Sequence, residues 1–471
     1  MKTKTQSRLL TVWALVIAVI LTGSTYAQHG HNEYRPEEVV CAMAPGYTID
    51  SINAAFGTTV KSHLIQTDCY LLMIPSGQNA DSLAAVIAAR PDVLYCSPNF
   101  YIDAPEPFQR SSPFLDDQLT GDVETQTAAV SLDMTSVHTL ATGVNVDIAV
   151  IDGGVNFTHP EFTTDSVALI SGWDYIDDDP VANDEPGGAC SGHGTFVAGI
   201  LKLVAPESRM HAYRVLDTTG RGTGFAIAAA VLRAVDDGCR VINLSLGMVG
   251  VDDALDEALK YAKMNDVMVV ASAGNDSTAE NTIFPFPASH AYCLAVAALD
   301  TLNIKAIFSN YGLKVDYCAP GTGIYAPYMD TSYAWWDGTS FATPFVTGLA
   351  ALLISRDPTL NWEQIDTLIA ASAVNVDSLN PGFEGLLGHG LIDMVAALEA
   401  LDPLLIGDAN TDSIINIGDA VFIINYIFRS GPPPIRLVAA DANCDGRINV
   451  GDAVFIIRYL FSSGPAPCSA G

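Results

Sequence analysis

The central part of the chain alternates between continuous apolar runs and segments with helical spacing. The apolar runs cover residues 146–151, 210–215, 241–246, 267–271 and 294–298, and the helical segments include 195–202, 227–236 and 254–263. Apolar strands that alternate with helices favour a parallel sheet with helices on both faces. The pattern therefore predicts an α/β domain over residues 130–402, with its functional groups at the carboxyl ends of the strands.

Four side chains with useful chemistry occur where these elements are expected to begin or end. Asp152 ends an apolar run, His193 opens a helix between two glycines, and Asn275 follows another apolar run. Ser340 lies in a Gly-Thr-Ser turn before a buried helix. Each feature alone is more often structural, but together they could supply an orienting acid, a base, an oxyanion donor and a nucleophile. A serine hydroxyl reacts when a base takes its proton and donors stabilise the oxyanion.

The sequences around these residues resemble the signatures of the subtilases, the subtilisin-like serine proteases. The chain reads Val-Ile-Asp at 150–152, Gly-His-Gly-Thr-Phe-Val-Ala-Gly at 192–199, Ile-Asn-Leu-Ser-Leu-Gly at 242–247 and Gly-Thr-Ser-Phe-Ala-Thr-Pro at 338–344. The order aspartate, histidine, serine is that of subtilisin. The resemblance covers about residues 130–400 and implies the parallel sheet and the serine endopeptidase activity of that family.

This resemblance implies a role for each residue. His193 would take the proton of Ser340 as the serine attacks a peptide carbonyl, while Asp152 orients the imidazole. The side-chain amide of Asn275 and the backbone N–H of Ser340 would hold the oxyanion. The sequence departs from the family at Gly153, which stands in place of a hydroxyl residue beside Asp152.

The resemblance also implies where a protein or peptide substrate would bind. An extended substrate would add a strand between two segments of the chain, and an uncharged primary pocket would give a broad, apolar preference. The predicted substrate-binding residues are Gly220 and Gly222 on one side, Ser245, Leu246 and Gly247 on the other, and Ala273 and Gly274 at the pocket. Pro287 is expected to follow a cis peptide bond.

Residues 28–110 have the pattern of a smaller, separate unit. Strand-like and helix-like segments alternate in the order βαββαβ, which predicts a ferredoxin-like α+β domain. Residues 111–129 are polar and irregular, and predict an exposed, cleavable connector. Beside a subtilase domain, this unit resembles a subtilisin propeptide. The resemblance implies a zymogen whose propeptide assists folding, inhibits the protease and is cut off between about residues 103 and 127.

Two copies of one sequence pattern, 33 residues apart, lie within residues 404–471. Alternate oxygen ligands followed by a closing carboxylate suit a hard cation such as Ca²⁺. The predicted calcium ligands are Asp408, Asn410, Asp412, the Ile414 carbonyl and Asp419 in the first copy, and Asp441, Asn443, Asp445, Arg447 and Asp452 in the second. Because each loop closes with aspartate and a helix only follows the loop, the segment resembles a type I dockerin. This implies a small α-helical domain with two calcium loops that docks to a cohesin partner.

A second acidic segment lies just before the predicted histidine helix. Residues 174–184 contain five aspartates and are similar to the acidic calcium loops of some subtilases. A solvated acidic loop would give the same pattern, so the sequence leaves calcium binding there open.

The first residues and the overall charge indicate a compartment and exclude some partners. Lys2, Lys4 and Arg8 precede the apolar run 9–21, and small residues lead to Ala27. This predicts a signal peptide over residues 1–27, because the run is too short to span a bilayer. The mature chain is expected to be secreted, extracellular or cell-surface associated, without a membrane span. With 53 acidic and 22 basic residues, the chain is poorly suited to nucleic acid and well suited to calcium.

The nine cysteines would lie in an oxidising compartment after export. None forms a Cys-x-x-Cys pair, which argues against a zinc site. Cys444 and Cys468 are expected to form a disulfide. Four central cysteines allow three pairings, between which the sequence does not decide: Cys190, Cys239, Cys293 and Cys318.

We therefore interpret the sequence as that of a secreted, calcium-binding serine endopeptidase that is made as a self-processing zymogen and docked to a partner through its last domain. The alternative is a catalytically idle surface-binding protein that uses the dockerin for assembly. The presence of all four residues of the predicted site favours the enzyme.

Overall fold

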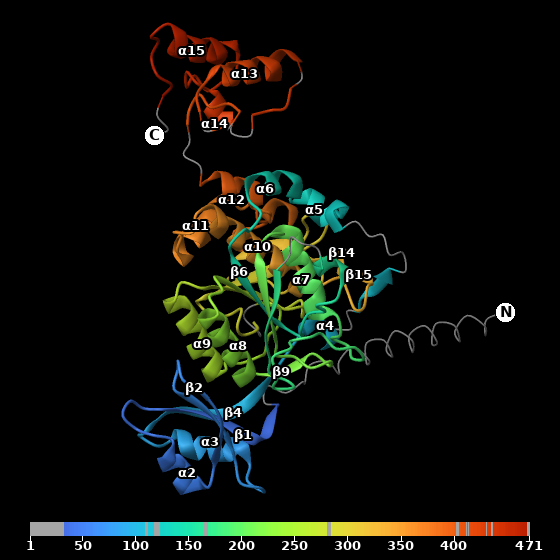
Figure 1. The fold of residues 1–471 in the computed structure, drawn as a ribbon, viewed down its shortest axis with the longest axis vertical. Coiled ribbons are helices and arrows are strands. Elements are labelled where there is room, and N and C mark those ends of the chain that lie inside the picture. Colours follow the sequence, from blue (N-terminus) through green and yellow to red (C-terminus); the bar gives the residue numbers. More distant parts are fainter. Residues whose placement is uncertain are drawn as a thin grey trace, which may run out of the picture. The chain divides into compact units, whose positions relative to one another are not determined.

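The computed structural model describes residues 33–108, 112–116, 123–163, 168–279, 284–401, 405–410, 412, 414–429, 431–434 and 437–468. The predicted signal peptide and its cleavage after Ala27 lie outside these residues. The chain divides into two compact units, residues 1–393 and 394–471, and each is described by itself (Figure 1).

The first unit begins with an antiparallel sheet that carries two helices. Its elements are β1 (Tyr34–Met43), α2 (Asp50–Phe56), β2 (Thr59–Leu64), β3 (Cys69–Met73), α3 (Ala80–Ala88) and β4 (Val93–Asp103). The strand order β2-β3-β1-β4 confirms the predicted ferredoxin-like arrangement. The apolar stripe of each helix and alternate strand residues form one buried cluster, which includes Val39, Ile52, Leu72 and Ile87. A disulfide between Cys41 and Cys96 joins β1 to β4.

Strand β4 is 11 residues long and continues beyond this cluster. Its last residues pair antiparallel with β9 (Arg221–Thr223), with Tyr101 opposite Thr223 and Asp103 opposite Arg221. Strand β9 belongs to the central part of the chain. The N-terminal and central parts therefore share one five-stranded sheet.

The predicted connector contains regular structure, which its polar sequence did not indicate. Between β4 and the central sheet the elements are α4 (Pro105–Phe108), β5 (Phe114–Asp116), a 3₁₀ turn (Val123–Thr125), α5 (Thr127–Ser131) and α6 (Met134–Leu140). Of these, β5, the 3₁₀ turn and the start of α5 lie in the predicted connector. Strand β5 pairs antiparallel with β15 (Tyr333–Trp336), which also pairs with β14 (Ile324–Pro327). Because β15 leads directly to the turn that contains Ser340, the connector lies beside the approach to that residue.

The central part is built on a seven-stranded sheet in the order β13-β12-β11-β10-β6-β8-β7. Its strands are β6 (Asp147–Asp152), β7 (Ala168–Asp174), β8 (Arg209–Arg214), β10 (Val241–Leu244), β11 (Met268–Ser272), β12 (Cys293–Leu299) and β13 (Tyr317–Pro320). Every neighbouring pair is parallel, as the uninterrupted apolar runs predicted.

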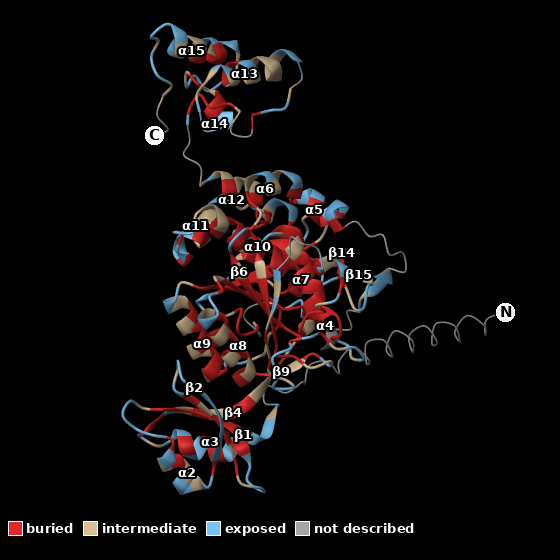
Figure 2. Cartoon of the chain, viewed as in Figure 1, coloured by how far each residue is buried: buried red, intermediate tan, exposed pale blue. Residues whose placement is uncertain are grey.

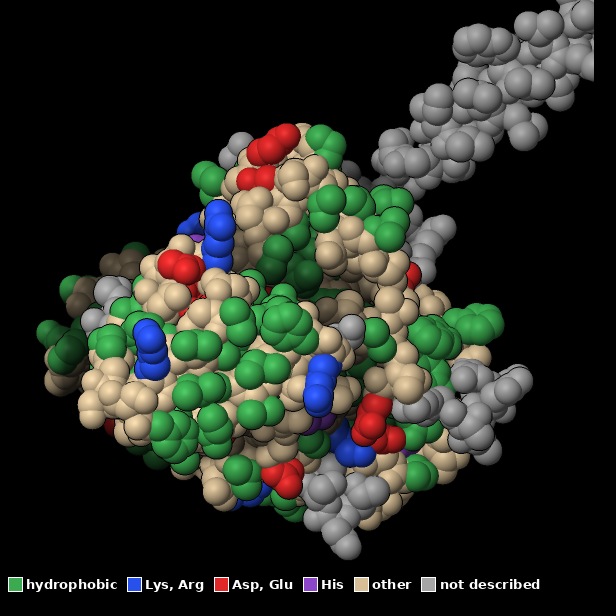
Figure 3. All heavy atoms as spheres, turned by 90° about the horizontal axis from the view of Figure 1, so that it is seen from above, with side chains coloured by type: hydrophobic (Ala, Val, Ile, Leu, Met, Phe, Trp, Pro, Cys, Tyr) green, Lys and Arg blue, Asp and Glu red, His purple; other side chains and the backbone are tan. Residues whose placement is uncertain are grey.

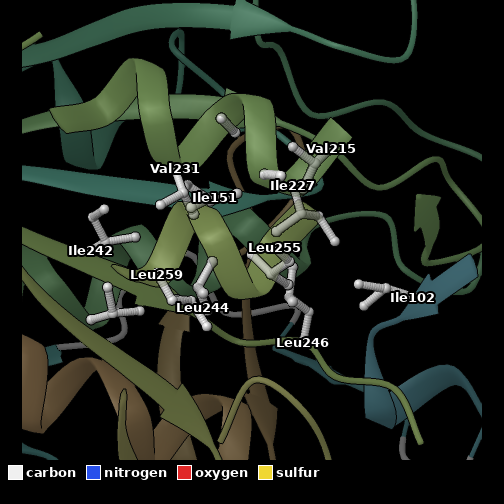
Figure 4. Close-up of a cluster of buried hydrophobic side chains, with 14 of the residues drawn as sticks. Ile102, Ile151, Val215, Ile227, Val231, Ile242, Leu244, Leu246, Leu255 and Leu259 are labelled. Carbon is white, nitrogen blue, oxygen red and sulfur yellow. The ribbon is translucent and has the colours of Figure 1, made fainter. Parts of the chain in front are cut away.

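Helices cover both faces of this sheet. Over one face, α8 (Gly224–Asp236) and α9 (Asp253–Met264) share a buried cluster with alternate strand residues such as Ile151 and Leu244 (Figure 4). The other face packs against α10 (Thr339–Arg356), which also contacts α7 (His193–Val204). Figure 2 shows that α7 and α10 are buried along most of their length. The last α-helix of this unit is α11 (Trp362–Ser372). The Phe286–Pro287 peptide bond is cis, as predicted.

Arg214, the last residue of β8, holds the acidic segment 174–184. Its guanidinium donates to Asp174 Oδ2 at 2.8 Å and Asp177 Oδ2 at 2.7 Å, and also to Glu185 at 2.8 Å. The Arg214 and Asp174 side chains are 3% and 2% exposed, so this pair is held away from solvent. These contacts give the acidic segment a structural role.

The cysteines divide into bonded and free groups. Cys444 and Cys468 form the predicted disulfide. None of the three possible pairings of the four central cysteines is present: all four are buried free thiols, as is Cys69. The fold keeps even the two on neighbouring strands apart, because Cys318 of β13 lies opposite Ala297 while Cys293 begins β12.

The second unit has a small helical core built from the repeat. Its helices are α12 (Met394–Glu399), α13 (Ile417–Arg429), α14 (Leu437–Ala440) and α15 (Val450–Phe461). Ala420 and Ile423 of α13 occupy the same positions in the repeat as Ala453 and Ile456 of α15, and all four are buried in one cluster. A helix follows each predicted loop, as the sequence indicated. Within the described part of the chain, no helix has the length and apolar character needed to cross a membrane.

Replacing Arg214 with methionine is expected to lower the free energy of unfolding by about 3 kcal/mol, because the buried Asp174 carboxylate would lose its cation. The matched control is Arg209→Met, which breaks an ion pair to Asp147 at a more exposed site and should cost less than about 1 kcal/mol. Guanidinium unfolding in a Ser340→Ala background, which prevents self-digestion, measures both. Equal losses for the two variants would contradict the structural role of Arg214.

Candidate active site

The structure brings the predicted acid and base into direct contact at the rim of the central sheet. Asp152 is the last residue of β6 and His193 is the first residue of α7. Asp152 Oδ1 accepts hydrogen bonds from His193 Nδ1 at 2.7 Å and from the Gly153 backbone N–H at 2.7 Å. Asp152 Oδ2 is buried and has no hydrogen-bond partner among the described residues. The missing hydroxyl group at Gly153 is consistent with this unpaired oxygen.

The local sequence around His193 fits its position at the start of α7. The N–H of Gly192 and the Thr195 hydroxyl donate to the buried carboxylate of Asp184, at 3.0 and 2.6 Å. Burial raises the pKa of Asp184 to about 7. A Cβ at Gly194 would come within 2.1 Å of the Gly154 carbonyl oxygen, so only glycine allows the helix to approach β6 this closely. Asp184, which the sequence analysis placed in a possible calcium loop, thus anchors the histidine helix.

The predicted nucleophile and base meet through a carboxylate that the sequence analysis missed. Glu106, in the short helix α4, is fully buried. Its Oε2 atom accepts a hydrogen bond from Ser340 Oγ at 2.9 Å and lies 3.1 Å from His193 Nε2. A single carboxylate oxygen therefore occupies the place where the serine and the imidazole would otherwise meet.

The same carboxylate fills the predicted oxyanion position. Asn275 Nδ2 donates to Glu106 Oε1 at 2.9 Å. The other end of the amide is fixed, because Asn275 Oδ1 accepts from the Thr339 N–H at 2.9 Å and from its hydroxyl at 2.8 Å. A Cβ at Gly338 would come within 2.2 Å of Glu106 Oε1, so the glycine before this turn leaves the space that the carboxylate fills.

The charges at this site favour a protonated imidazole. Burial opposes the positive charge, but the carboxylates of Asp152 and Glu106 raise the pKa of His193 to about 10. With both ring nitrogens protonated, Nδ1 donates to Asp152 and Nε2 donates to Glu106. A histidine in this state cannot accept the proton of Ser340, so the site as it stands is blocked.

The end of β4 occupies the predicted substrate-binding strand. Asp103 exchanges two backbone hydrogen bonds with Gly247, at 3.2 and 2.9 Å, and the Ala104 N–H donates to the Gly220 carbonyl at 2.8 Å. Ile102 lies opposite Gly222 and is fully buried in the cluster that contains Leu246 (Figure 4). The end of β4 thus lies extended between residues 220–222 and Gly247, as expected for a substrate.

The other predicted substrate-binding residues form hydrogen bonds that stabilise the turn containing Ser340. The Ser245 hydroxyl donates to the Ser340 carbonyl at 2.8 Å, and the Gly274 N–H donates to the Thr339 hydroxyl at 3.1 Å. Gly274 has a φ of 95°, and a side chain there would meet Asn310 at 2.5 Å. The neighbouring Ala273 carbonyl accepts from Asn310 Nδ2 at 2.8 Å.

Glu106 was not predictable from a motif. It stands between two prolines in Ala-Pro-Glu-Pro, a sequence that carries no catalytic or strand pattern. Its position follows from the pairing of β4 with β9, which joins residues more than a hundred positions apart. The available signal was the expectation that the propeptide inhibits the protease and is cut between about residues 103 and 127, which places this segment near the site.

The first repeat loop in the second unit has the geometry of a cation site. Carboxylate oxygens of Asp408, Asp412 and Asp419 lie within 4.8 Å of one another. The loop is folded around them, since the Asp412 N–H donates to Asp408 Oδ1 at 3.1 Å and the Asn410 N–H donates to Asp419 Oδ1 at 3.1 Å. The Ile414 N–H donates to Asp412 at 3.0 Å.

The second repeat loop has the same internal hydrogen bonds. The Asp445 N–H donates to Asp441 Oδ1 at 3.0 Å and the Asn443 N–H donates to Asp452 Oδ1 at 3.3 Å. Gly446 forms the sharp turn with a φ of 82°. Burial raises the pKa of Asp452, as it does for Asp419 in the first loop. Two buried closing carboxylates among other acidic oxygens fit a divalent cation better than they fit solvent.

Comparison with known proteins identifies three families along the chain. The subtilase family matches residues 143–390, the fervidolysin N-terminal prodomain matches residues 21–99, and the dockerin type I domain matches residues 406–461. The subtilase match alone covers more than half of the chain.

Individual relatives agree with these matches. Thermitase from Thermoactinomyces vulgaris is 39% identical over 227 residues, which are 46% of this chain and 77% of that protein. Subtilisin DY from Bacillus licheniformis is 34% identical over 269 residues, which are 55% of this chain and 92% of that protein.

Solved structures share the fold. Fervidolysin from Fervidobacterium pennivorans, a keratinolytic enzyme related to subtilisin, aligns with a TM-score of 0.65 and 24% identity over 79% of this chain and 62% of that one. A lanthipeptide protease aligns with a TM-score of 0.53 and 27% identity over 62% of this chain and 99% of that one. The chain belongs to the subtilase family of serine proteases and combines the protease domain with an N-terminal prodomain and a type I dockerin domain.

Proposed function

We propose that the chain hydrolyses peptide bonds in protein or peptide substrates, with Ser340 as the nucleophile, His193 as the general base and Asp152 as the orienting acid. The convergence of three separate segments on one carboxylate group carries this proposal. Ser340, His193 and Asn275 all contact Glu106, so their reactive atoms face a common point where a scissile carbonyl could lie.

In the proposed reaction, Glu106 has left the site and the imidazole is neutral. His193 Nε2 takes the proton of the Ser340 hydroxyl as its oxygen attacks the carbonyl carbon. Asp152 holds Nδ1–H and stabilises the imidazolium, while the Asn275 amide and the Ser340 N–H hold the oxyanion. The imidazolium then gives its proton to the leaving nitrogen as the C–N bond breaks. Water hydrolyses the acyl-enzyme by the same sequence of proton transfers.

We also propose that the full-length chain is a zymogen that processes itself. Strand β4 fills the strand site and Glu106 fills the reaction centre, so no substrate enters until this segment is released. Cleavage is proposed between residues 103 and 127. The proposed organisation is a signal peptide (1–27), a propeptide (28–110), a connector (111–129), a peptidase domain (130–402) and a dockerin domain (404–471).

The dockerin domain is proposed to bind Ca²⁺ and to dock to a cohesin-type partner. The clustered carboxylates of the first loop and the matching internal hydrogen bonds of the second loop support calcium binding. Apolar side chains at equivalent repeat positions support docking, because Ile417 and Val421 of α13, and Val450 and Val454 of α15, are each between 45% and 49% exposed. Figure 3 shows one face of the molecule, on which hydrophobic and charged side chains are interspersed. A docked protease with a signal peptide would be secreted or associated with the cell surface.

Replacing Asn275 with alanine in the processed enzyme should lower kcat by roughly 10²- to 10³-fold with a smaller effect on KM, because one oxyanion donor is lost. Replacing Ser340 with alanine should abolish both casein hydrolysis and labelling by a fluorophosphonate. Casein assays and active-site labelling of the three proteins measure this. If wild type and Ser340→Ala behaved alike, the alternative of an idle surface-binding protein would stand instead.

A prodomain fragment of residues 28–108, added to the processed enzyme, should inhibit it through Glu106. Glu106→Ala is expected to weaken inhibition by roughly 30-fold or more, because three buried donors lose their charged acceptor. Asp81→Ala, at an exposed position of α3, is the control and should inhibit like the unmodified fragment. Inhibition constants from peptide hydrolysis measure both, and equal constants would contradict the role of Glu106.

The same inhibition should depend on pH. The Glu106 carboxylate helps to raise the pKa of His193 in the complex to about 10, so the free enzyme has a lower value and binding takes up a proton. Inhibition should be tightest below the pKa of His193 in the free enzyme and weaken as the pH rises towards 10. Glu106→Gln should flatten this dependence of inhibition on pH. A dependence that the substitution leaves unchanged would argue against the role of the Glu106 carboxylate.

Residues 404–471 should bind two Ca²⁺ ions and gain thermal stability on binding. Asp452→Ala should remove one ion and leave the other loop competent. Isothermal titration of the domain and of its variant gives the stoichiometry. The control is Asp393→Ala, which lies outside the repeat and is tested in the full chain. A stoichiometry of two in Asp452→Ala would show that this carboxylate is not a ligand.

A further inference from the structure

Arg221 places a cation at the rim of the substrate strand site. It lies on β9 directly opposite Asp103, in the three-residue ladder that joins β4 to the peptidase domain. Its Nε atom donates to Asp103 Oδ1 at 3.0 Å, and Nη1 donates to Glu33 Oε2 at 2.5 Å. The guanidinium also lies 4.8 Å from the centre of the Tyr101 ring. A net charge of −31 for the whole chain makes a cation at this position a specific feature rather than part of a basic surface.

These three partners lie in the segment that processing is proposed to remove. Glu33, Tyr101 and Asp103 all precede residue 104, whereas Arg221 stays with the protease. The backbone of Asp103 is fixed by two hydrogen bonds to Gly247, so its side chain is held at a defined position on the enzyme. A substrate that follows the same backbone path would place one side chain where that of Asp103 now lies.

The register of residues 103–106 identifies which substrate side chain this would be. Ala104 and Pro105 separate Asp103 from Glu106, whose carboxylate touches Ser340. If the residue at the position of Pro105 contributes the scissile carbonyl, the position of Asp103 is third on the amino side of the cut. The neighbouring position of Ile102 faces the buried apolar cluster, so it selects on size and shape rather than charge.

We propose that Arg221 is a specificity-determining residue that gives the protease a preference for an acidic side chain at the substrate position that pairs with Gly247. The inference rests on the proposed role of Ser340 and names a preference that the apolar pockets cannot supply. The Arg221 and Asp103 side chains are 29% and 31% exposed, so the ion pair is partly solvated. An effect of roughly threefold to fivefold in kcat/KM at low ionic strength is expected for such a pair, and added salt should reduce it.

Three peptides that differ only at this position, with Asp, Asn or Lys, test the proposal. The processed wild-type enzyme should cleave the Asp peptide roughly threefold to fivefold better than the Asn peptide, and the Lys peptide worst. Arg221→Gln should cleave the Asp and Asn peptides with equal kcat/KM, and Arg221→Glu should prefer Lys to Asp. This reversal is not expected from a merely structural effect of removing the arginine. Arg233→Gln, on the exposed side of α8, should retain the wild-type preference.

Each outcome bears on one claim. Equal cleavage of the Asp and Asn peptides by the wild type, or an Asp preference that survives in Arg221→Gln, would overturn this inference and leave the protease assignment intact. Failure of the wild type to cleave any peptide or casein would instead contradict the proposed function. If the Arg221 variants do not mature, wild type at rising ionic strength gives the same comparison. The Asp preference should fall with salt, and a preference that does not change would count against Arg221.

Discussion

One buried carboxylate, that of Glu106, joins the three parts of the chain that form the reaction centre. It accepts hydrogen bonds from Ser340 of α10 and Asn275 after β11, and it contacts His193 of α7. A carboxylate is costly to bury unless it is paired and hydrogen-bonded, so these three groups are also what makes its position possible. The same donors would stabilise the negative charge that develops on a substrate carbonyl. Inhibition and the proposed catalysis therefore depend on a single set of positively polarised groups.

This arrangement explains why the prodomain and the protease domain form one compact unit. Strand β4 is held by backbone pairing to β9 and Gly247, and it delivers Glu106 to the site at the end of that strand. The carboxylates of Asp152 and Glu106 then flank the His193 imidazole and raise its pKa. The protonated ring cannot act as the general base. Removing the prodomain takes away one of these two anions along with the strand that blocks the cleft. In the proposed activation, release would lower the pKa of His193 and open the binding site in the same step.

The parts of the structure that depend on short sequence patterns were predictable. The parallel sheet follows from apolar runs, the ends of β6 and β11 place Asp152 and Asn275, and Gly194 is required by close packing. The missed features depend on partners far away in the sequence. The composition of segment 174–184 does not reveal that Arg214 on β8 pairs with two of its aspartates, and counting cysteines does not show that Cys293 and Cys318 are out of register on adjacent strands. Glu106 belongs to this second group, because its place depends on how β4 pairs with β9.

The most direct measurement of the central claim is the titration of His193 in the unprocessed chain. Selective ¹⁵N labelling of the histidines in a Ser340→Ala precursor would follow both ring nitrogens by NMR between about pH 6 and pH 10. We predict that the His193 ring stays doubly protonated at pH 8 in the precursor and titrates at a lower pH once the prodomain is removed. A His193 ring that titrates near its ordinary value of about 6.5 in the precursor would contradict a carboxylate from residue 106 at the reaction centre.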